Sequence, residues 1–378
     1  MSAAVASESV CLVTGATGSL GRSIVAELLH RGGNVRALVR PTSRTQAQSE
    51  LAAMASDSSD GSISFVVGDL SDASSLDGLL NGVSHVIHAA AQLGDWGPWS
   101  RFENGIVDAT GHLVDACMDS DIERFVHVGS VAAYGHPRGN GPWDESLSLG
   151  QNLWWWDHYA RAKMLSEQQA MRLRDHATLV RPTWIVGPAD RTILPRIIAK
   201  LARGDVSLLG DGNNHLNMVL ADDVARSIVE ACQRDEARGK TYNLCSDGEI
   251  TQRAFFDLLA DHLGCDRVTK SVPKWVAHHV GFLSECFGHL TNSSTPPQVT
   301  RHGISLITRP TSFRSEAAKH DLDWRAGRPI GEGLIEALNA IAARQTEPTE
   351  QPELARQWQP TRGLTTASPI GSPASLTT

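Results

Sequence analysis

A tyrosine and a lysine four residues apart supply groups that can transfer a proton. Tyr159 and Lys163 stand in the segment Tyr-Ala-Arg-Ala-Lys, whereas Tyr134 and Tyr242 have no lysine at this spacing. On a helix, side chains four positions apart share a face, so the ammonium would lie beside the phenol. A nearby cation lowers the pKa of a tyrosine from its ordinary value of about 10. Tyr159 could then take a proton from an alcohol or give one to a carbonyl oxygen.

A glycine-rich turn follows the first apolar segment of the chain. Gly15, Gly18 and Gly21 come after the apolar run 10–13 and open the amphipathic stretch 22–30. Glycines here permit a tight turn, close approach to a pyrophosphate and close helix–strand packing. The helix that follows would offer free N–H groups and its positive dipole end to the phosphates. We therefore predict a dinucleotide site at this turn, with these contacts: Gly15, Thr17, Gly18, Ser19, Leu20 and Gly21.

A basic residue, Arg40, ends the second predicted strand, 35–39. An acidic group at this point binds the ribose 2′-hydroxyl of NAD, whereas a basic group suits the 2′-phosphate of NADP. Arg40, with Arg44 nearby, favours NADP as the cofactor. NAD is the alternative, in which Arg40 is a solvated surface residue.

Strand-like and helix-like segments alternate through the first half of the chain. The strand-like segments are 10–13, 35–39, 63–67, 83–88, 124–128 and a sixth that begins at 178. Helix-like segments, such as 107–119 and 158–173, separate them, and this alternation indicates a parallel sheet covered on both faces. We predict an α/β fold in which a doubly wound Rossmann sheet carries a smaller, mostly helical C-terminal substrate-binding lobe.

The same pattern predicts three regions. The nucleotide-binding domain would span 9–187, with return segments near 214–247, and the substrate lobe would occupy mainly 188–344. The remainder, 345–378, is rich in Pro, Thr, Ser and Gln. Since few large apolar residues occur there, we predict a disordered tail.

These motifs resemble those of the extended short-chain dehydrogenase/reductase family, within the NAD-dependent epimerase/dehydratase superfamily. The resemblance spans roughly 9–344 and includes the turn from Ser130 to Gly135 and the Arg-Pro segment 181–188. It implies that Ser130 is the catalytic serine, whose hydroxyl stabilises charge on the reacting oxygen. It also implies cofactor contacts at the strand ends: Asp69, Leu70, Ala89, Ala90, Ala91, Tyr159, Lys163, Pro182, Thr183 and Ile185.

One position departs from the family pattern. Family members place an Asn at the start of the helix after the fourth strand. In this chain, alignment of the Ala109-Thr110 pair puts Ile106 at that position, and Asn104 lies two residues earlier. Either the local turn differs or the supporting role of the Asn is absent, which bears on proton relay rather than on the reaction class.

Within the family, the nearest resemblance is to 3β-hydroxysteroid dehydrogenase-like enzymes and 3-oxoacyl reductases, through segments 94–99, 272–275 and 295–297. Seven of the ten tryptophans fall between positions 96 and 184, in predicted loops at the carboxyl ends of strands. Large flat side chains there would suit a ring system or an acyl chain, or would pack the interface between lobes. The candidate substrate contacts are Trp96, Trp99, Trp154, Trp155 and Trp184.

We therefore expect an NAD(P)-dependent oxidoreductase that interconverts a secondary alcohol and a ketone on a mostly apolar substrate. One alternative is a nucleotide-sugar epimerase or dehydratase, which would use the same Ser130, Tyr159 and Lys163. The other is a non-catalytic NADP-sensing protein. Such sensors tend to lose the tyrosine and lysine that this chain keeps.

Composition limits the other partners. A net charge of −8 argues against a nucleic-acid-binding face. The six cysteines have no C-x-x-C spacing, which argues against a zinc site or disulfides and suits a reducing, cytoplasmic setting. We expect no metal and no transmembrane helix. The stretch 273–290 favours an amphipathic lid helix, with contact to a membrane surface as the alternative, and the resemblance allows a homodimer.

Overall fold

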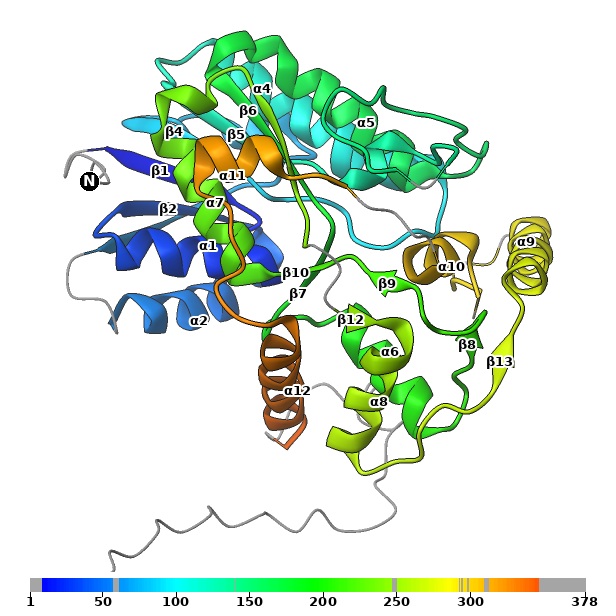
Figure 1. The fold of residues 1–378 in the computed structure, drawn as a ribbon. Helices are drawn as coiled ribbons and strands as arrows, with labels where there is room; N and C mark the ends of the chain where they lie inside the picture. Colours follow the sequence, from blue (N-terminus) through cyan, green and yellow to red (C-terminus); the bar gives the residue numbers. More distant parts are fainter. Residues whose placement is uncertain are drawn as a thin grey trace, which may run out of the picture.

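A parallel sheet forms the centre of the computed structural model, which describes residues 9–56, 61–139, 141–246, 250–291, 293, 295–297, 299–308 and 313–346. Within this part of the chain, the sheet has seven strands in the order β11-β6-β5-β4-β1-β2-β3, all parallel (Figure 1). Its strands are β1 (Val10–Thr14), β2 (Asn34–Val39), β3 (Ser62–Val67), β4 (Val83–His88), β5 (Arg124–Val128), β6 (Ala177–Pro182) and β11 (Thr241–Leu244). The predicted doubly wound α/β fold is confirmed.

Helices cover both faces of this sheet (Figure 1). Because both faces are covered, the central strands are largely apolar, and every residue of β5 and β6 is buried. One face is covered by α1 (Ser19–His30), α2 (Arg44–Ser56), α7 (Ala221–Gln233) and α11 (Glu316–Leu322). The other face is covered by α4 (Ala109–Met118) and α5 (His158–Ala170). The predicted helix 107–119 is in part a π-helix, η3 (Glu103–Asp108), which runs into α4 from the short α3 (Trp99–Phe102).

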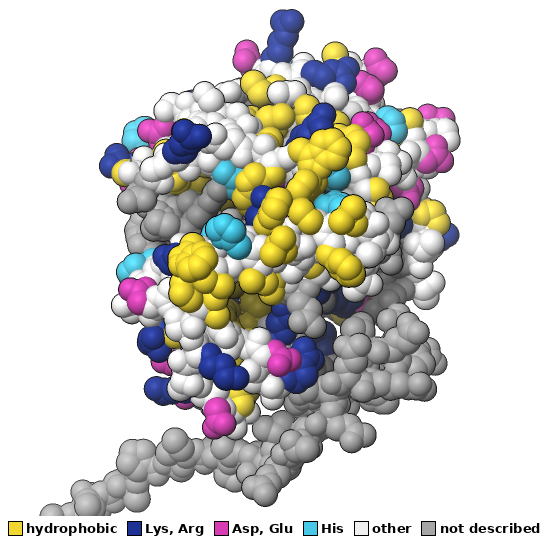
Figure 2. Space-filling model, turned by 90° about the vertical axis from the view of Figure 1, so that its right-hand side faces the viewer, with side chains coloured by type: hydrophobic (Ala, Val, Ile, Leu, Met, Phe, Trp, Pro, Cys, Tyr) yellow, Lys and Arg dark blue, Asp and Glu magenta, His cyan; other side chains and the backbone are white. Residues whose placement is uncertain are grey.

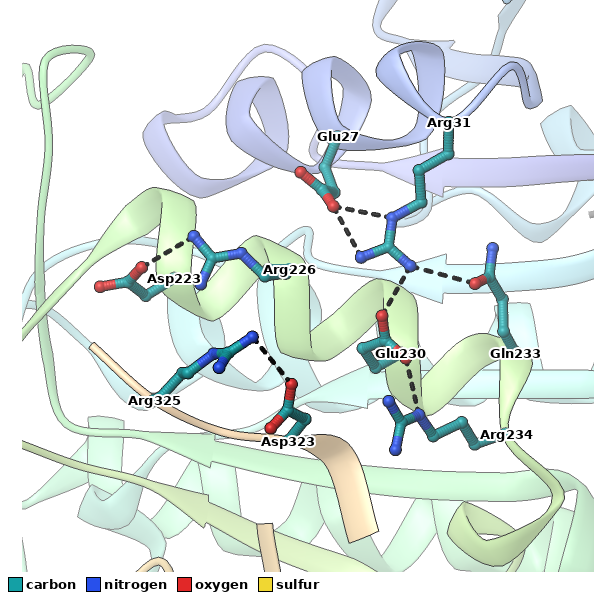
Figure 3. A network of polar contacts seen from close by, with 9 residues as sticks. All are labelled: Glu27, Arg31, Asp223, Arg226, Glu230, Gln233, Arg234, Asp323 and Arg325. Carbon is teal, nitrogen blue, oxygen red and sulfur yellow. Dashed lines mark hydrogen bonds and ion pairs between the residues drawn. The ribbon is translucent and has the colours of Figure 1, made fainter. Parts of the chain in front are cut away.

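A polar network fixes α7 against α1 although about 200 residues separate them in sequence (Figure 3). The Arg31 guanidinium donates hydrogen bonds to Glu27 (2.7 Å), Glu230 (2.8 Å) and the Gln233 side chain (3.1 Å). These groups are largely shielded from solvent, so each charge has a partner where it is partly desolvated. The chain thus returns to the layers of the central sheet after residue 220.

A second apolar core lies beyond the sheet, around α6 (Ile193–Ala202), α8 (Gln252–Leu263) and α12 (Ile330–Thr346). Short strand pairs accompany it: β7 (Trp184–Val186) with β10 (Met218–Leu220), β9 (His215–Leu216) with β12 (Ile250–Thr251), and β8 (Leu208–Leu209) with β13 (Ser271–Val272). At its margin lie α9 (Lys274–Leu290) and α10 (Arg301–Thr308) (Figure 1). None of the described helices has both the length and the apolarity needed to cross a bilayer. From residue 347 onward, the predicted tail 345–378 lies outside the described residues.

The strand order reverses between β1 and β4, and the loops that follow these two strands meet at their carboxyl ends. The Ala89 N–H donates to the Thr14 carbonyl (3.3 Å), and the Ala90 N–H donates to the Thr14 hydroxyl (3.2 Å). Gly15 has a φ of +70°, and a Cβ added there would lie 2.7 Å from the Ala90 nitrogen. Only glycine satisfies both conditions. Open α/β sheets bind ligands in the crevice at such a switch point.

The contact between Gly21 and the turn provides a test of this packing. A Cβ at Gly21 would lie 2.0 Å from the Gly15 carbonyl oxygen, which is backbone and has little freedom to move. We expect Gly21→Ala to lower the free energy of unfolding by about 2 kcal/mol or more, measured by urea denaturation. Gly331→Ala is the matched control, because the added methyl would be in ordinary contact with Leu258 at 3.5 Å. Equal stability of the two variants would contradict this packing.

Candidate active site

Ser130 and Tyr159 are brought together from β5 and α5. Ser130 follows β5 at the start of a 3-10 turn, η4 (Val131–Tyr134), and its hydroxyl oxygen accepts a hydrogen bond from the Ala132 N–H (3.1 Å). The phenol of Tyr159, in the first turn of α5, lies near the Ser130 hydroxyl. Burial raises the pKa of Tyr159 above its ordinary value, and the nearby Ser130 hydroxyl opposes this shift. The phenol is therefore protonated at neutral pH and able to donate its proton.

Lys163 lies one helical turn after Tyr159 and is 5% exposed. Its ammonium donates a hydrogen bond to the Val128 carbonyl at the end of β5 (3.1 Å). Burial lowers the pKa of Lys163 to about 8, and the Glu167 carboxylate opposes the shift. Ser130, Tyr159 and Lys163 therefore occupy one corner of the sheet.

A buried ion pair beneath this corner was not predicted from the sequence. Glu167 lies one turn beyond Lys163 and accepts hydrogen bonds from the Arg181 guanidinium of β6, the shortest 2.7 Å long. Arg181 also donates to the Tyr134 hydroxyl (2.8 Å), which donates to the Asn243 side chain (2.8 Å). Burial raises the pKa of Glu167, against the effect of Arg181. The available signal was the spacing 159, 163, 167, which puts a tyrosine, a cation and an anion along one face of a helix.

The position that departs from the family pattern lies in the π-helix. Ile106 is buried and packs in a cluster with Ala162 and Tyr159, whereas Asn104 is exposed. The Ile106 carbonyl accepts the hydroxyl proton of Thr110 (2.6 Å). The local turn therefore differs, and apolar packing against α5 occupies the place where an Asn side chain was expected.

Thr110 also fixes a histidine close to Lys163. Since the hydroxyl proton of Thr110 is used on Ile106, its oxygen must accept from His88 Nε2 (3.0 Å), and His88 Nδ1 then accepts from the Thr14 hydroxyl (2.8 Å). Burial lowers the pKa of His88 to about 3, and the charge of Lys163 adds to this effect. His88 is thus a neutral link between the glycine-turn strand β1 and the helix α4.

The glycine turn fits a dinucleotide. Gly18 precedes α1 with an extended backbone and, as a glycine, has no side chain that could cap the first N–H groups of the helix. These groups are suited to phosphate oxygens. A Cβ at Gly187 would lie 3.7 Å from the Ser19 hydroxyl, so the segment after β6, with Pro182, Thr183 and Ile185, passes beside the turn. Thr183 itself is held by its N–H, which donates to the Leu244 carbonyl (3.0 Å).

Arg40 and Asp69 lie at the adenosine end of the predicted site, after β2 and β3. The Ser71 N–H (2.9 Å) and hydroxyl (2.7 Å) donate to the Asp69 carboxylate. These two hydrogen bonds lower the pKa of Asp69, with a smaller contribution from the nearby charge of Arg40. Leu70 is buried next to Asp69. A cation and an ionised carboxylate thus lie together at the edge of the crevice.

The five candidate tryptophans have different surroundings. Trp96 is buried and donates to the Ser293 carbonyl (2.9 Å), and Trp99 lies under the Arg161 guanidinium (4.7 Å from the ring centre). Trp154 stacks on His136, with ring centres 3.9 Å apart. Trp155 is 84% exposed, and Trp184 is buried in the second core beside Phe255 (5.7 Å). Trp99 therefore packs near Tyr159, while Trp184 packs inside the second apolar core.

A second group of titratable side chains, not predicted from the sequence, lies next to Tyr159. Asp157 directly precedes α5, and its carboxylate is 2.6 Å from His136 Nε2. Burial acts to raise the pKa of Asp157, but the hydrogen bond with His136 and the nearby His302 leave it lowered. The His302 ring, on α10, is edge-on to Tyr159 with centres 5.8 Å apart. Part of the lobe therefore lies over the phenol.

Comparison with known proteins gives a consistent result. The family model described as "NAD dependent epimerase/dehydratase family" matches residues 11–245. A 2-alkyl-3-oxoalkanoate reductase of Stenotrophomonas maltophilia (strain K279a) is 26% identical, over 88% of this chain and 99% of the relative. A 3beta-hydroxysteroid-dehydrogenase/decarboxylase (isoform 2) of Arabidopsis thaliana is 25% identical, over 90% of this chain and 63% of the relative.

A solved structure shares the fold. The UDP-glucuronic acid 4-epimerase of Bacillus cereus, in complex with NAD, superposes with a TM-score of 0.65 at 19% identity. The match covers 89% of this chain and 99% of that one.

The depressed pKa of Lys163 predicts a pH dependence of stability. The Lys163 ammonium loses its proton at about pH 8 in the folded protein and at about pH 10.5 in the unfolded chain. Between these pH values the unfolded state binds more protons, so the free energy of unfolding rises with pH. Relative to Lys163→Met, the wild-type free energy of unfolding should increase by about 2 kcal/mol from about pH 8 to about pH 10. Urea titrations of the cofactor-free protein measure this, with the exposed Lys270→Met as control. Parallel pH profiles for wild type and Lys163→Met would contradict a buried ammonium.

Proposed function

The chain belongs to the NAD dependent epimerase/dehydratase family, and on this premise we propose that it is an NADPH-dependent oxidoreductase that reduces a ketone on a mostly apolar substrate. The resemblance inferred from the sequence motifs is thus confirmed at the level of the family. The observation that carries the proposal is the proximity of the Ser130 hydroxyl to the Tyr159 phenol, with Lys163 one turn away. This arrangement supplies a proton donor, a group to orient it and a cation at the end of the crevice where a nicotinamide would lie.

The three side chains have distinct roles in the proposed reaction. NADPH, when bound, supplies the hydride. The Tyr159 phenol gives its proton to the ketone oxygen, and the Ser130 hydroxyl holds that oxygen and disperses the charge that develops on it. The Lys163 ammonium stabilises the resulting phenolate until a proton returns. Because burial raises the pKa of Tyr159, the resting phenol is protonated, which suits reduction rather than oxidation.

The preference for NADPH rests on Arg40. Arg40 is exposed at the end of β2, where the adenosine ribose of a bound dinucleotide lies in this fold. A guanidinium there would make charge-assisted hydrogen bonds with a 2′-phosphate. NAD, the cofactor in the family's description, has no 2′-phosphate and so would not form these hydrogen bonds with Arg40.

The apolar substrate is supported by the side chains around the start of α5. Trp99, Phe102 and Ile106 pack with Tyr159 and Ala162. Flat and aliphatic groups of this kind suit an alkyl chain or a ring system better than a nucleoside diphosphate. We therefore place the substrate among 2-alkyl-3-oxoalkanoates or 3-oxosteroids, classes close to those named for two relatives.

A nucleotide-sugar epimerase is the second candidate, favoured by the shared fold of the epimerase from Bacillus cereus. The same Ser130, Tyr159 and Lys163 would serve its reaction. It would return each hydride to the substrate, so no cofactor would be consumed. Net oxidation of NADPH during turnover separates the two functions.

Replacement of the phenol hydroxyl tests the acid. Tyr159→Phe should lower kcat for ketone reduction by about 100- to 10,000-fold, because the proton donor is lost. Its Kd for NADPH, measured by calorimetry, should change little. Tyr242→Phe is the matched control, since Tyr242 is a core residue whose hydroxyl donates to Asp321 (2.9 Å), and it should keep the wild-type kcat. Full activity of Tyr159→Phe would refute the mechanism.

Replacement of Arg40 tests the cofactor preference. Arg40→Ala should raise KM for NADPH about tenfold and leave KM for NADH nearly unchanged, because a charge-assisted hydrogen bond contributes about 1.5–3 kcal/mol. Arg203→Ala serves as the control, because Arg203 is exposed at the C-terminal end of α6 in the second core. If both KM values respond equally to Arg40→Ala, the residue does not select the 2′-phosphate.

A further inference from the structure

The helix α9 (Lys274–Leu290) has small residues on the side that faces the protein. Its fully buried positions are Ala277, Gly281, Glu285 and Gly288, which lie on one face at helical spacing. A Cβ at Gly281 would lie 2.8 Å from the Ile304 side chain, and one at Gly288 would lie 2.7 Å from the Trp96 ring. Glycine at these positions lets the helix lie close on α10 and on the Trp96 loop.

The outward side of α9 carries large apolar residues. Phe287 is 70% exposed and Leu290 is 86% exposed, far more than the core positions of the same helix. The exposed large apolar residues of α9 are Trp275, Val280, Phe282, Leu283, Phe287 and Leu290. Trp155, on the neighbouring loop, extends this surface through its edge contact with Trp156, which stacks on Phe282. Figure 2 shows hydrophobic side chains gathered on this face of the molecule, with His, Lys and Arg among them and a few Asp and Glu at the margin.

The polarity of α9 is thus the reverse of an ordinary surface helix, whose large apolar residues face the core. The ionisable residues in α9 are Lys274, Glu285 and three histidines. Its one carboxylate, Glu285, is buried, where it accepts from Arg301 Nε (2.7 Å) and from the Trp156 indole (2.9 Å). The outer face of α9 therefore carries no carboxylate that would repel an anionic surface.

We propose that the outer face of α9, together with Trp155, docks on the surface of an anionic lipid bilayer. Apolar side chains on one face of a helix insert into the boundary between headgroups and acyl chains, and tryptophan is favoured at that depth. Trp155 and Trp275 supply this residue type, and the Lys and Arg side chains on this face suit anionic headgroups.

A bilayer fits this surface better than a second copy of the chain. An interface between copies surrounds its apolar centre with a rim of hydrogen-bonding groups. On the exposed positions of α9, the polar side chains are His279 and His289 alone. A fluid lipid surface accepts projecting side chains without a complementary set of partners.

The docking face is linked to the candidate active site. Phe282 stacks on Trp156, and Arg301 lies between the rings of Trp154 and Trp156, with its carbon 4.1 Å and 5.1 Å from their centres. The next residue, His302, is edge-on to Tyr159. Docking itself is independent of the reaction. The delivery of an apolar ketone from the bilayer to Tyr159 is a consequence that rests on the proposed function.

Vesicle binding tests the docking. The full chain would be sedimented with vesicles of phosphatidylcholine mixed with phosphatidylglycerol, and the bound fraction measured for wild type and for a Phe287→Ser/Leu290→Ser variant. Wild type should bind, and the variant should bind at least about tenfold more weakly, because two exposed apolar side chains lose their burial. A Met118→Ser/Met171→Ser variant is the control, because it removes two exposed apolar side chains at the C-terminal ends of α4 and α5. It should bind vesicles as wild type does.

Two further measurements keep the outcomes distinct. Light scattering without lipid should give the same mass for wild type and for the Phe287→Ser/Leu290→Ser variant. A lower mass for the variant would assign the face to a second copy of the chain.

The rate of reduction of a short soluble ketone should be the same for wild type and this variant, while the rate for a vesicle-borne ketone should be lower for the variant. Absence of turnover would refute the proposed function and leave the binding result intact. The docking would be refuted if wild type did not bind vesicles, or if the Phe287→Ser/Leu290→Ser variant bound them as strongly as wild type.

Discussion

Burial of the Lys163 ammonium constrains the whole corner of the sheet that forms the candidate active site. A cation that is 5% exposed needs compensation: the Val128 carbonyl accepts its hydrogen bond, and the negative charge of Glu167 favours its charged form. Glu167 in turn is held by Arg181 of β6. Gly129 makes room for this pair, because a Cβ there would lie 2.5 Å from a Glu167 oxygen. The charge of Lys163 thus ties α5 to β5 and β6 and sets the position of Tyr159 one turn earlier.

The sheet order turns this corner into a site. Because β1 and β4 are neighbours, the glycine turn and the loop at Ala90 meet at one crevice, and Ser130 follows the next strand along the sheet. His88 connects the two sides of the crevice through Thr14 and Thr110 and stays neutral beside Lys163. The buried Lys163 ammonium therefore lies on the side of the crevice where a phenolate would form. The C-terminal part of the chain contributes to the site through His302 of α10, whose ring lies edge-on to Tyr159.

The elements of this fold follow from local sequence, but the contacts between them do not. Apolar runs predicted the strands, glycine spacing predicted the tight turn before α1, and the interval between Tyr159 and Lys163 predicted that they share a helix face. The ion pair of Glu167 with Arg181 needs the packing of α5 on β6, which no local pattern contains. Likewise, the π-helix at Ile106 and the outward side of α9 depend on neighbours distant in sequence. Periodicity identifies an apolar helix face but not what covers it.

Net transfer of hydride is the central claim, and isotope labelling tests it most directly. The full-length protein would be supplied with NADPH that carries deuterium at its transferable position, together with a 2-alkyl-3-oxoalkanoate or a 3-oxosteroid. Our account predicts an alcohol with deuterium on the former ketone carbon and an equal amount of NADP⁺. Conversion of a nucleotide sugar to its epimer, with no deuterium incorporated and no NADPH consumed, would contradict it.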